Sequence, residues 1–333
     1  MKKTTHILLF IFLSSCFKPD EQIPKIWYQQ AQVHLDHEKS RATYIDLDNL
    51  SKNNNSEEQN WQLKFQNTPK GWSIYLNALE QVAVHNTKET DFDKVDQTYF
   101  NLDIPWQIDI PTSSGAYPAI GTWGDFNFPN PKSFKNVYLV SWTDGNTSFV
   151  DKIQILDASE DAYHIRYSRL EGGEIKSAWI SKEANYTHSY FSLLEGRQVK
   201  RVEPSIDNWD LCFTYFSDSI SSHTLPHVVE TINPDFGIYH GALINYEQNK
   251  VCIDSTSNFD DIDYFYASKL EFEQQDQIFN LFYHWDEQSQ RIILDKNLSL
   301  IVKNQDKYFA VKPRKLTNEG TEGVSMTLKV KQL

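Results

Sequence analysis

Asn60-Trp61-Gln62-Leu63-Lys64-Phe65 recurs in the second half of the chain as Asn208-Trp209-Asp210-Leu211-Cys212-Phe213. In each copy Trp, Leu and Phe occupy every second position, so these three side chains share one face of an extended strand. An apolar face that alternates with polar residues is typical of a strand that covers a core on one side. Each copy therefore predicts an antiparallel strand, and the recurrence calls for a search for further repeats.

Further blocks around the two Trp segments match each other in the same order. They are Tyr44–Leu47 with Tyr190–Leu193, Tyr75–Asn77 with Leu243–Asn245, Val82–Val84 with Val251–Ile253, Asp91–Asp96 with Asn258–Asp263, and a closing pair of apolar strands at 137–156 with its counterpart at 300–311. The order and spacing predict a tandem duplication, with a junction near Lys182 to Tyr186. The second copy carries about twenty extra residues between its Trp and Asn strands, which we interpret as a loop.

The fold class that follows is mostly β. Aromatic residues make up 14% of the chain, and they favour strands. Asp-Gly and Asn-rich turns between apolar runs are typical of hairpins. We expect two tandem antiparallel β domains, over residues 43–183 and 184–333.

The first residues of the chain resemble a bacterial lipoprotein signal. Two lysines precede the apolar run Ile7–Leu13, which at seven residues is far shorter than the roughly 20 that span a bilayer. Leu13-Ser14-Ser15-Cys16 is a lipoprotein cleavage box, so we expect a signal peptide over residues 1–15 and acylation of Cys16. Residues 16–42 are expected to form a polar tether. Because Phe17 rather than Asp follows the cysteine, the lipid anchor is expected in the outer membrane, on its periplasmic face or at the cell surface.

Composition restricts the partners. The formal net charge of −13 argues against nucleic acid, whose phosphates must be neutralised by Lys and Arg. Beyond the signal peptide no apolar run is long enough to span a membrane, so the lipid is the expected link to the membrane. Two cysteines remain after lipidation, Cys212 and Cys252, and the sequence leaves open whether they form a disulfide or stay as buried free thiols.

The matched blocks resemble the HmuY-like family of bacterial lipoproteins. The residues that carry the resemblance are Tyr190–Gly196 (YFSLLEG), Asn208–Phe213 (NWDLCF) and Lys152–Ile155 (KIQI). It covers roughly residues 43–170 as one unit and 185–330 as a second. The resemblance implies a mostly β domain that captures haem and delivers it to a TonB-dependent outer-membrane receptor.

Haem iron requires axial donors such as His, Met, Tyr or Cys. Characterised haem binders of the family use two His or two Met between the Asn strand and the closing strand pair. A paired-Met site is excluded because Met326 is the only methionine of the mature chain. In the second copy His284 approximates one family position. The candidates for a second ligand are Tyr264, Tyr266, Tyr283 and His240; the first copy has no His in this interval.

Other patterns are weaker. His223 and His227 have a metal spacing, but Pro226 opposes the helix that would bring them together. The acidic segments at 92–96 and 259–263 lack the glycine and closing glutamate of a calcium loop, which favours structural turns. No catalytic motif occurs, so we predict that the protein is not an enzyme. Two alternatives to haem capture remain, a surface lipoprotein that binds glycans through exposed aromatic residues and a scaffold without a small ligand.

Overall fold

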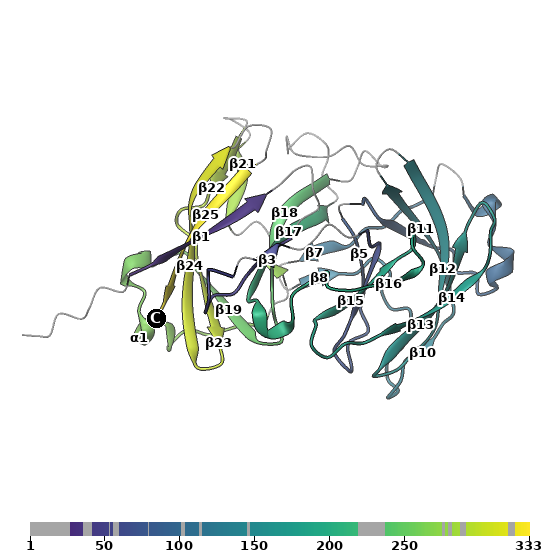
Figure 1. Ribbon diagram of the computed structural model, residues 1–333, viewed down its shortest axis with the longest axis horizontal. Coiled ribbons are helices and arrows are strands. Elements are labelled where there is room, and N and C mark those ends of the chain that lie inside the picture. The colour runs from purple at the N-terminus through teal and green to yellow at the C-terminus, as the bar shows by residue number, and fades with distance from the viewer. Residues whose placement is uncertain are drawn as a thin grey trace, which may run out of the picture.

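The structure, a computed structural model, describes residues 27–35, 42–52, 54–55, 60–78, 80–100, 104–112, 115–144, 147–218, 237–274, 277–278, 282–286, 291–318 and 324–333. These residues form mostly antiparallel β structure, as the sequence predicts. Two β bodies lie side by side along the long axis of the molecule (Figure 1). No helix within these residues is long and apolar enough to cross a membrane.

The first body is built from one continuous stretch of chain, residues 60–203. Its larger sheet has the order β14-β13-β12-β11-β6, from β6 (Ala83–Asn86), β11 (Val137–Asp144), β12 (Thr147–Ala158), β13 (Ala162–Arg169) and β14 (Lys176–Ser181). Its smaller sheet has the order β16-β15-β4-β5, from β4 (Leu63–Gln66), β5 (Ile74–Leu76), β15 (His188–Ser192) and β16 (Arg197–Val199). The same stretch of chain also forms two short hairpins. They are β7 (Ile110–Thr112) with β8 (Gly115–Tyr117) and β9 (Gly124–Asp125) with β10 (Lys132–Ser133).

The second body combines the two ends of the described chain. One sheet has the order β1-β25-β24-β23-β19, from β1 (Gln29–Leu35), β19 (Asn249–Asp254), β23 (Ser299–Asn304), β24 (Lys307–Asn318) and β25 (Val324–Gln332). The other has the order β20-β18-β17-β2-β3, from β2 (Thr43–Ile45), β3 (Asn54–Asn55), β17 (Leu211–Asp218), β18 (Gly237–Ile244) and β20 (Gln277–Ile278). A separate hairpin consists of β21 (Tyr283–Asp286) and β22 (Arg291–Leu294).

Each body has its main core between its two sheets. In the first body Leu63 and Phe65 of β4 pack in one cluster with Tyr163 and Ile165 of β13. In the second body the strands β2, β17, β23, β24, β25 and β1 contribute to one cluster in the same way. Period-two alternation explains this arrangement: in β4 the buried Leu63 and Phe65 alternate with the half-buried Lys64 and Gln66.

The two Trp strands have matching partners. Leu63 of β4 pairs with Phe191 of β15, and Leu211 of β17 pairs with Ile45 of β2. These pairs join residues of the matched sequence blocks in the same register. The larger sheets match as well, because their strands have the same spatial order. In the first body this order is β6-β11-β12-β13-β14, and in the second it is β19-β23-β24-β25-β1.

The expected tether over residues 16–42 is wrong for residues 29–35. These residues form β1, which pairs antiparallel with β25 over Gln29–Leu35. Ala31 and Val33 are buried in the second core, whereas Gln30 and Gln32 are exposed. The polar residues between the apolar positions made the segment look like a linker, although its alternation is that of an edge strand.

The strand pairing also differs from the expected boundaries at 43–183 and 184–333. β2, at residues 43–45, belongs to a sheet of the second body, and β15 and β16, at residues 188–199, belong to the first. An unpaired sheet edge leaves backbone N–H and C=O groups without partners. β14 covers the edge of β13, and β1 covers the edge of β25, so the chain that precedes the first body closes the second.

Some expectations fall on other parts of the chain. The signal peptide, Cys16 and the pair His223 and His227 lie outside the described residues. The acidic segments form 3-10 turns, η1 (Phe92–Lys94) and η4 (Phe259–Asp261), as expected for structural turns. Cys212 is buried and Cys252 half-buried, and both are free thiols.

Candidate functional site

The two bodies meet at a pair of tyrosines from matched positions. Tyr190 of β15 packs edge-on against Trp61, with ring centroids 4.9 Å apart and planes at 75°. Tyr44 of β2 packs against Trp209 in the same way, at 5.2 Å and 78°. The phenol groups of Tyr44 and Tyr190 also interact with each other across the junction. The junction therefore brings the two copies of one aromatic pair together.

Repeated polar contacts hold each Trp strand in place. Asn77 Nδ2 donates to the carbonyl of Trp61 at 2.7 Å, and Asn245 Nδ2 donates to that of Trp209 at 2.8 Å. The residues that follow the two tryptophans, Gln62 and Asp210, also make equivalent hydrogen bonds. Gln62 Oε1 accepts from the N–H of Leu193 at 2.6 Å, and Asp210 Oδ2 accepts from that of Leu47 at 2.7 Å. These contacts explain why Asn and the Trp-x-Leu pattern recur in both copies, although the Asn lies 16 residues after the Trp in the first copy and 36 residues after it in the second.

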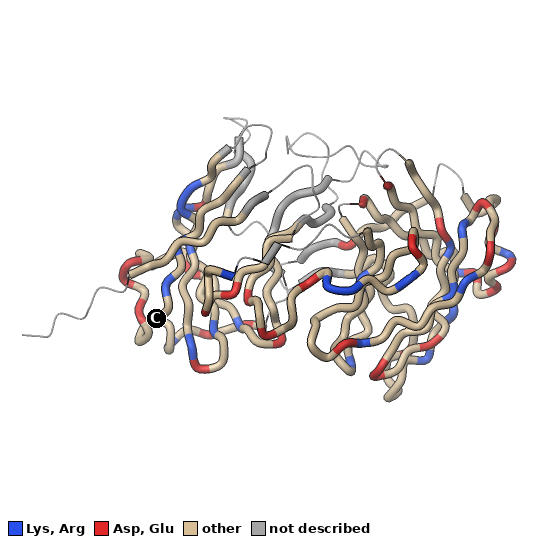
Figure 2. Tube along the Cα trace, viewed as in Figure 1, with Lys and Arg blue, Asp and Glu red and all other residues tan. Residues whose placement is uncertain are grey.

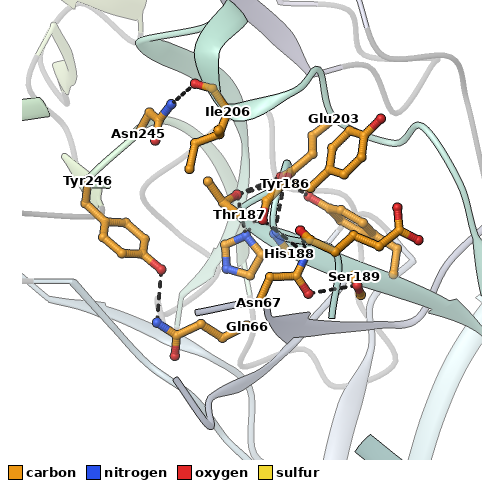
Figure 3. A network of polar contacts seen from close by, with 12 residues as sticks. Gln66, Asn67, Tyr186, Thr187, His188, Ser189, Glu203, Ile206, Asn245 and Tyr246 are labelled. Carbon is orange, nitrogen blue, oxygen red and sulfur yellow. Dashed lines mark hydrogen bonds and ion pairs between the residues drawn. The ribbon is translucent and has the colours of Figure 1, made fainter. Parts of the chain in front are cut away.

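A buried carboxylate, Glu203, lies beside this junction in the first body (Figure 3). It accepts hydrogen bonds from the hydroxyl of Thr187 at 2.8 Å, the backbone N–H of His188 at 2.9 Å and the hydroxyl of Tyr190 at 2.8 Å. Burial raises the pKa of Glu203, but the hydrogen bonds and the nearby His188 outweigh burial and hold it below the ordinary value. Glu203 is therefore ionised inside the protein.

His188 is the neighbour of this carboxylate. Its Nδ1 lies 3.8 Å from Glu203 and 2.8 Å from the hydroxyl of Thr187. Burial and then the charge of Lys64 lower the pKa of His188, and the opposing effect of Glu203 is smaller. We infer a neutral imidazole beside an ionised carboxylate. The site then buries one charge rather than two.

The contacts continue from one body to the other. Gln66 Nε2 of β4 donates to the hydroxyl of Tyr246, which follows β18, at 2.9 Å (Figure 3). A small cavity at this junction is lined by residues of both bodies, among them Lys64, His188, Trp209 and Tyr246. Its volume of about 20 Å³ suits a water molecule and is far too small for a haem.

The chemistry of the junction is that of a closed polar contact. Burial raises the pKa values of the Tyr44 and Tyr190 phenols and of the Cys212 thiol. All three groups therefore stay protonated at neutral pH, and Cys212 lacks the thiolate that a nucleophile requires. No group of three or more His, Cys, Asp or Glu side chains that could hold a metal ion occurs within the described residues.

The haem-ligand candidates Tyr283, His284 and His240 belong to two strands of the second body. Tyr283 and His284 occupy β21, opposite Leu294 and Ile293 of β22. His240 lies in β18, opposite Tyr215 of β17, so it belongs to a different sheet. The side chains of these three candidates lie outside the described part of the structure, and their ligand roles stay predictions.

Sequence reasoning missed Glu203 and His188. The matched blocks indicated Tyr44 and Tyr190, but no motif marks Glu203 as the partner of His188, fifteen residues earlier in the chain. Only the pairing of β15 with β16 and β4 brings these side chains to one place.

Comparison of the chain with protein-family models, with curated proteins and with solved structures finds no match. The family expectation therefore rests on the residues that carry the resemblance.

Proposed function

We propose that this protein is a lipid-anchored envelope protein, not an enzyme, that captures haem for a TonB-dependent receptor in the outer membrane. The observation that carries the proposal is the matched placement of the two Trp strands. The resemblance to haem-capturing lipoproteins rests on these blocks, and both copies pair in the same register. The cleavage box ending at Cys16 supports the anchor.

The structure restricts where a haem would bind. The junction cavity is too small for the macrocycle. We assign the proposed haem site to the end of the second body that carries β21 and β22, because the sequence candidates Tyr283 and His284 belong to β21. Phe282 anchors this hairpin in the second core, where its ring lies 5.8 Å from that of Phe213. Successive positions of a strand belong to opposite faces. Tyr283 and His284 therefore cannot both bind the iron of one haem. The residue that does would share the iron with a donor from another element, such as His240.

A hemin titration tests the proposal. The purified mature chain should give a saturable Soret shift with one equivalent of hemin, because axial ligation changes the electronic state of the iron. His284→Ala should weaken this binding at least tenfold, and Tyr283→Phe should leave it unchanged if His284 is the ligand. His164→Ala, on the outer surface of the first body, is the matched control and should bind like the wild type.

The opposite outcome is equally clear. A chain that binds no hemin, or whose binding survives both His284→Ala and His240→Ala, would exclude this ligand site and with it haem capture by the second body.

A further inference from the structure

We propose, building on the lipid anchor of the proposed function, that an aromatic face at the end of the second body where β1 begins docks on the membrane surface and inserts into zwitterionic headgroups. The face consists of Trp27, just before β1, and of Tyr264 and Phe265 in α1 (Tyr264–Ala267). Their exposed fractions are 85%, 55% and 67%, which is unusual for side chains of this size. In Figure 1 α1 lies at the outer end of the second body, beside the start of β1.

Packing brings together the two segments that carry these residues. Tyr28, next to Trp27, packs on the cluster that contains Phe259, Ala267 and Tyr308. The ring of Tyr264 lies 5.4 Å from that of Tyr308 and joins α1 to the same cluster. The buried residues of this cluster hold α1 and the start of β1 together, so the exposed aromatic residues are attached to a packed part of the protein.

The matched position of the first body shows that the fold does not require these aromatics. There Asp96 caps a turn by accepting from the N–H of Thr98 at 2.9 Å, as Asp263 caps α1 by accepting from that of Tyr266 at 2.7 Å. The two residues after the cap are Gln97 and Thr98 in the first body, but Tyr264 and Phe265 in the second. A capped turn forms with either pair.

The start of the edge strand shows the same contrast. Ala31 and Val33 of β1 occupy the positions of Ala178 and Ile180 of β14, because both strands pair with the last long strand of their body. By this register Trp27 corresponds to Glu174. At these three matched positions the second body therefore has aromatic residues where the first body has polar ones.

The length of the preceding chain selects a membrane as the partner. Only residues 17–26 separate the predicted acylation site from Trp27. Even a fully extended chain of this length keeps Trp27 within about 40 Å of the lipidated residue. Exposed Trp, Tyr and Phe side chains favour the headgroup region, where an aromatic ring leaves water and a polar tip stays wet.

Charge selects zwitterionic rather than anionic lipid. Asp260, Asp261 and Asp263 lie next to α1, and the acidic segments appear red at this end in Figure 2. An anionic surface would repel them. Lys269 lies over the ring of Phe265, with Nζ 3.5 Å from its centroid, and can reach a phosphate from there.

Vesicle binding tests this surface independently of acylation and of haem. The mature chain with Cys16→Ser is mixed with phosphatidylcholine vesicles, and bound protein is measured by flotation. A variant with Trp27→Glu, Tyr264→Gln and Phe265→Thr carries the residues of the first body. We expect its partition coefficient to fall at least about tenfold, since three partly buried aromatic rings are lost from the contact. Brominated lipid should quench part of the tryptophan fluorescence of the parent chain and less of that of Trp27→Glu.

The matched control is Phe126→Ser with Phe128→Ser, two exposed aromatics of the first body, which should bind vesicles like the parent chain. Thermal melts establish that each variant is folded. Equal partitioning of the parent chain and the triple variant, including no binding by either, would overturn the proposal. Tighter binding to vesicles containing phosphatidylglycerol would overturn the choice of a zwitterionic surface. Neither result depends on whether Cys16 is acylated, which mass spectrometry of the natural protein decides, or on the hemin titration.

Discussion

At the scale of single residues, Glu203 and His188 determine how the junction responds to pH. Glu203 is ionised and His188 neutral in the folded protein, because hydrogen bonds support the carboxylate and burial opposes the imidazolium. The two groups act in the same direction. Each takes up a proton in the unfolded chain at a higher pH than in the folded protein, so acid favours unfolding.

We predict that His188→Gln removes the contribution of the imidazole, both its own titration and its effect on Glu203. The pKa of His188 is lowered from the ordinary 6.5, so the stability that it contributes is present above pH 6.5 and is lost as the pH falls below that value. The variant has no imidazole to titrate. The difference in free energy of unfolding between wild type and variant should therefore shrink from pH 7.5 to pH 5, as measured by urea denaturation at each pH.

Comparing the two proteins at each pH is necessary because other groups oppose this trend. Burial raises the pKa of Asp109 and of Asp151 to about 6, which makes the folded protein more stable in acid. These groups are common to both proteins and cancel in the difference. A difference that stays constant over this pH range would contradict the inferred neutral state of His188.

At the scale of elements, β1 is the strand that closes the second body. It covers the edge of β25 over seven residue pairs and contributes Ala31 and Val33 to the core. With the proposed lipid anchor at Cys16, β1 would be the first described element of the chain after the membrane.

We predict that Val33→Asp destabilises the second body by roughly 3 kcal/mol or more, since it buries a carboxylate without a partner. Gln30→Asp, at an exposed position of the same strand, should change the free energy of unfolding by about 0.5 kcal/mol or less. Chemical denaturation followed by circular dichroism measures both. Similar stabilities for the two variants would mean that β1 does not belong to the core.

At the scale of the whole molecule, two matched bodies are connected in an order that their sequence repeat does not show. The first body is continuous from residue 60 to residue 203, and the second needs both ends of the described chain. The polar junction at Tyr44, Tyr190 and Glu203 then joins the bodies through side chains from both of them.

We predict that a fragment of residues 60–205 folds alone, whereas a fragment of residues 43–183 does not. The first contains every strand of its two sheets. The second lacks β15 and β16, so it exposes the edge of β4 and part of the apolar core, and it carries β2 without its partner. Near-ultraviolet circular dichroism and thermal melts distinguish them, and a cooperative melt of the 43–183 fragment would show that the bodies are divided differently.

The sequence by itself determined the strand class and the repeated positions. Trp61 and Trp209, with their neighbouring Leu and Phe residues, alternate with period two, and this local pattern is sufficient to predict strands that cover a core. The capped turns at Asp91 and Asn258 were also predictable, because a short polar side chain bonds to the backbone two residues later.

Only the tertiary structure decided which strands share a sheet and where Glu203 meets His188. Strand pairing depends on free edges and on cores formed by residues far apart in the chain, and two similar repeats offer nearly equivalent partners to the same strand. β2 and β15 could each have paired within their own repeat. They pair instead with β17 and β4, and a choice between such similar sheets leaves no mark in the local pattern of residues.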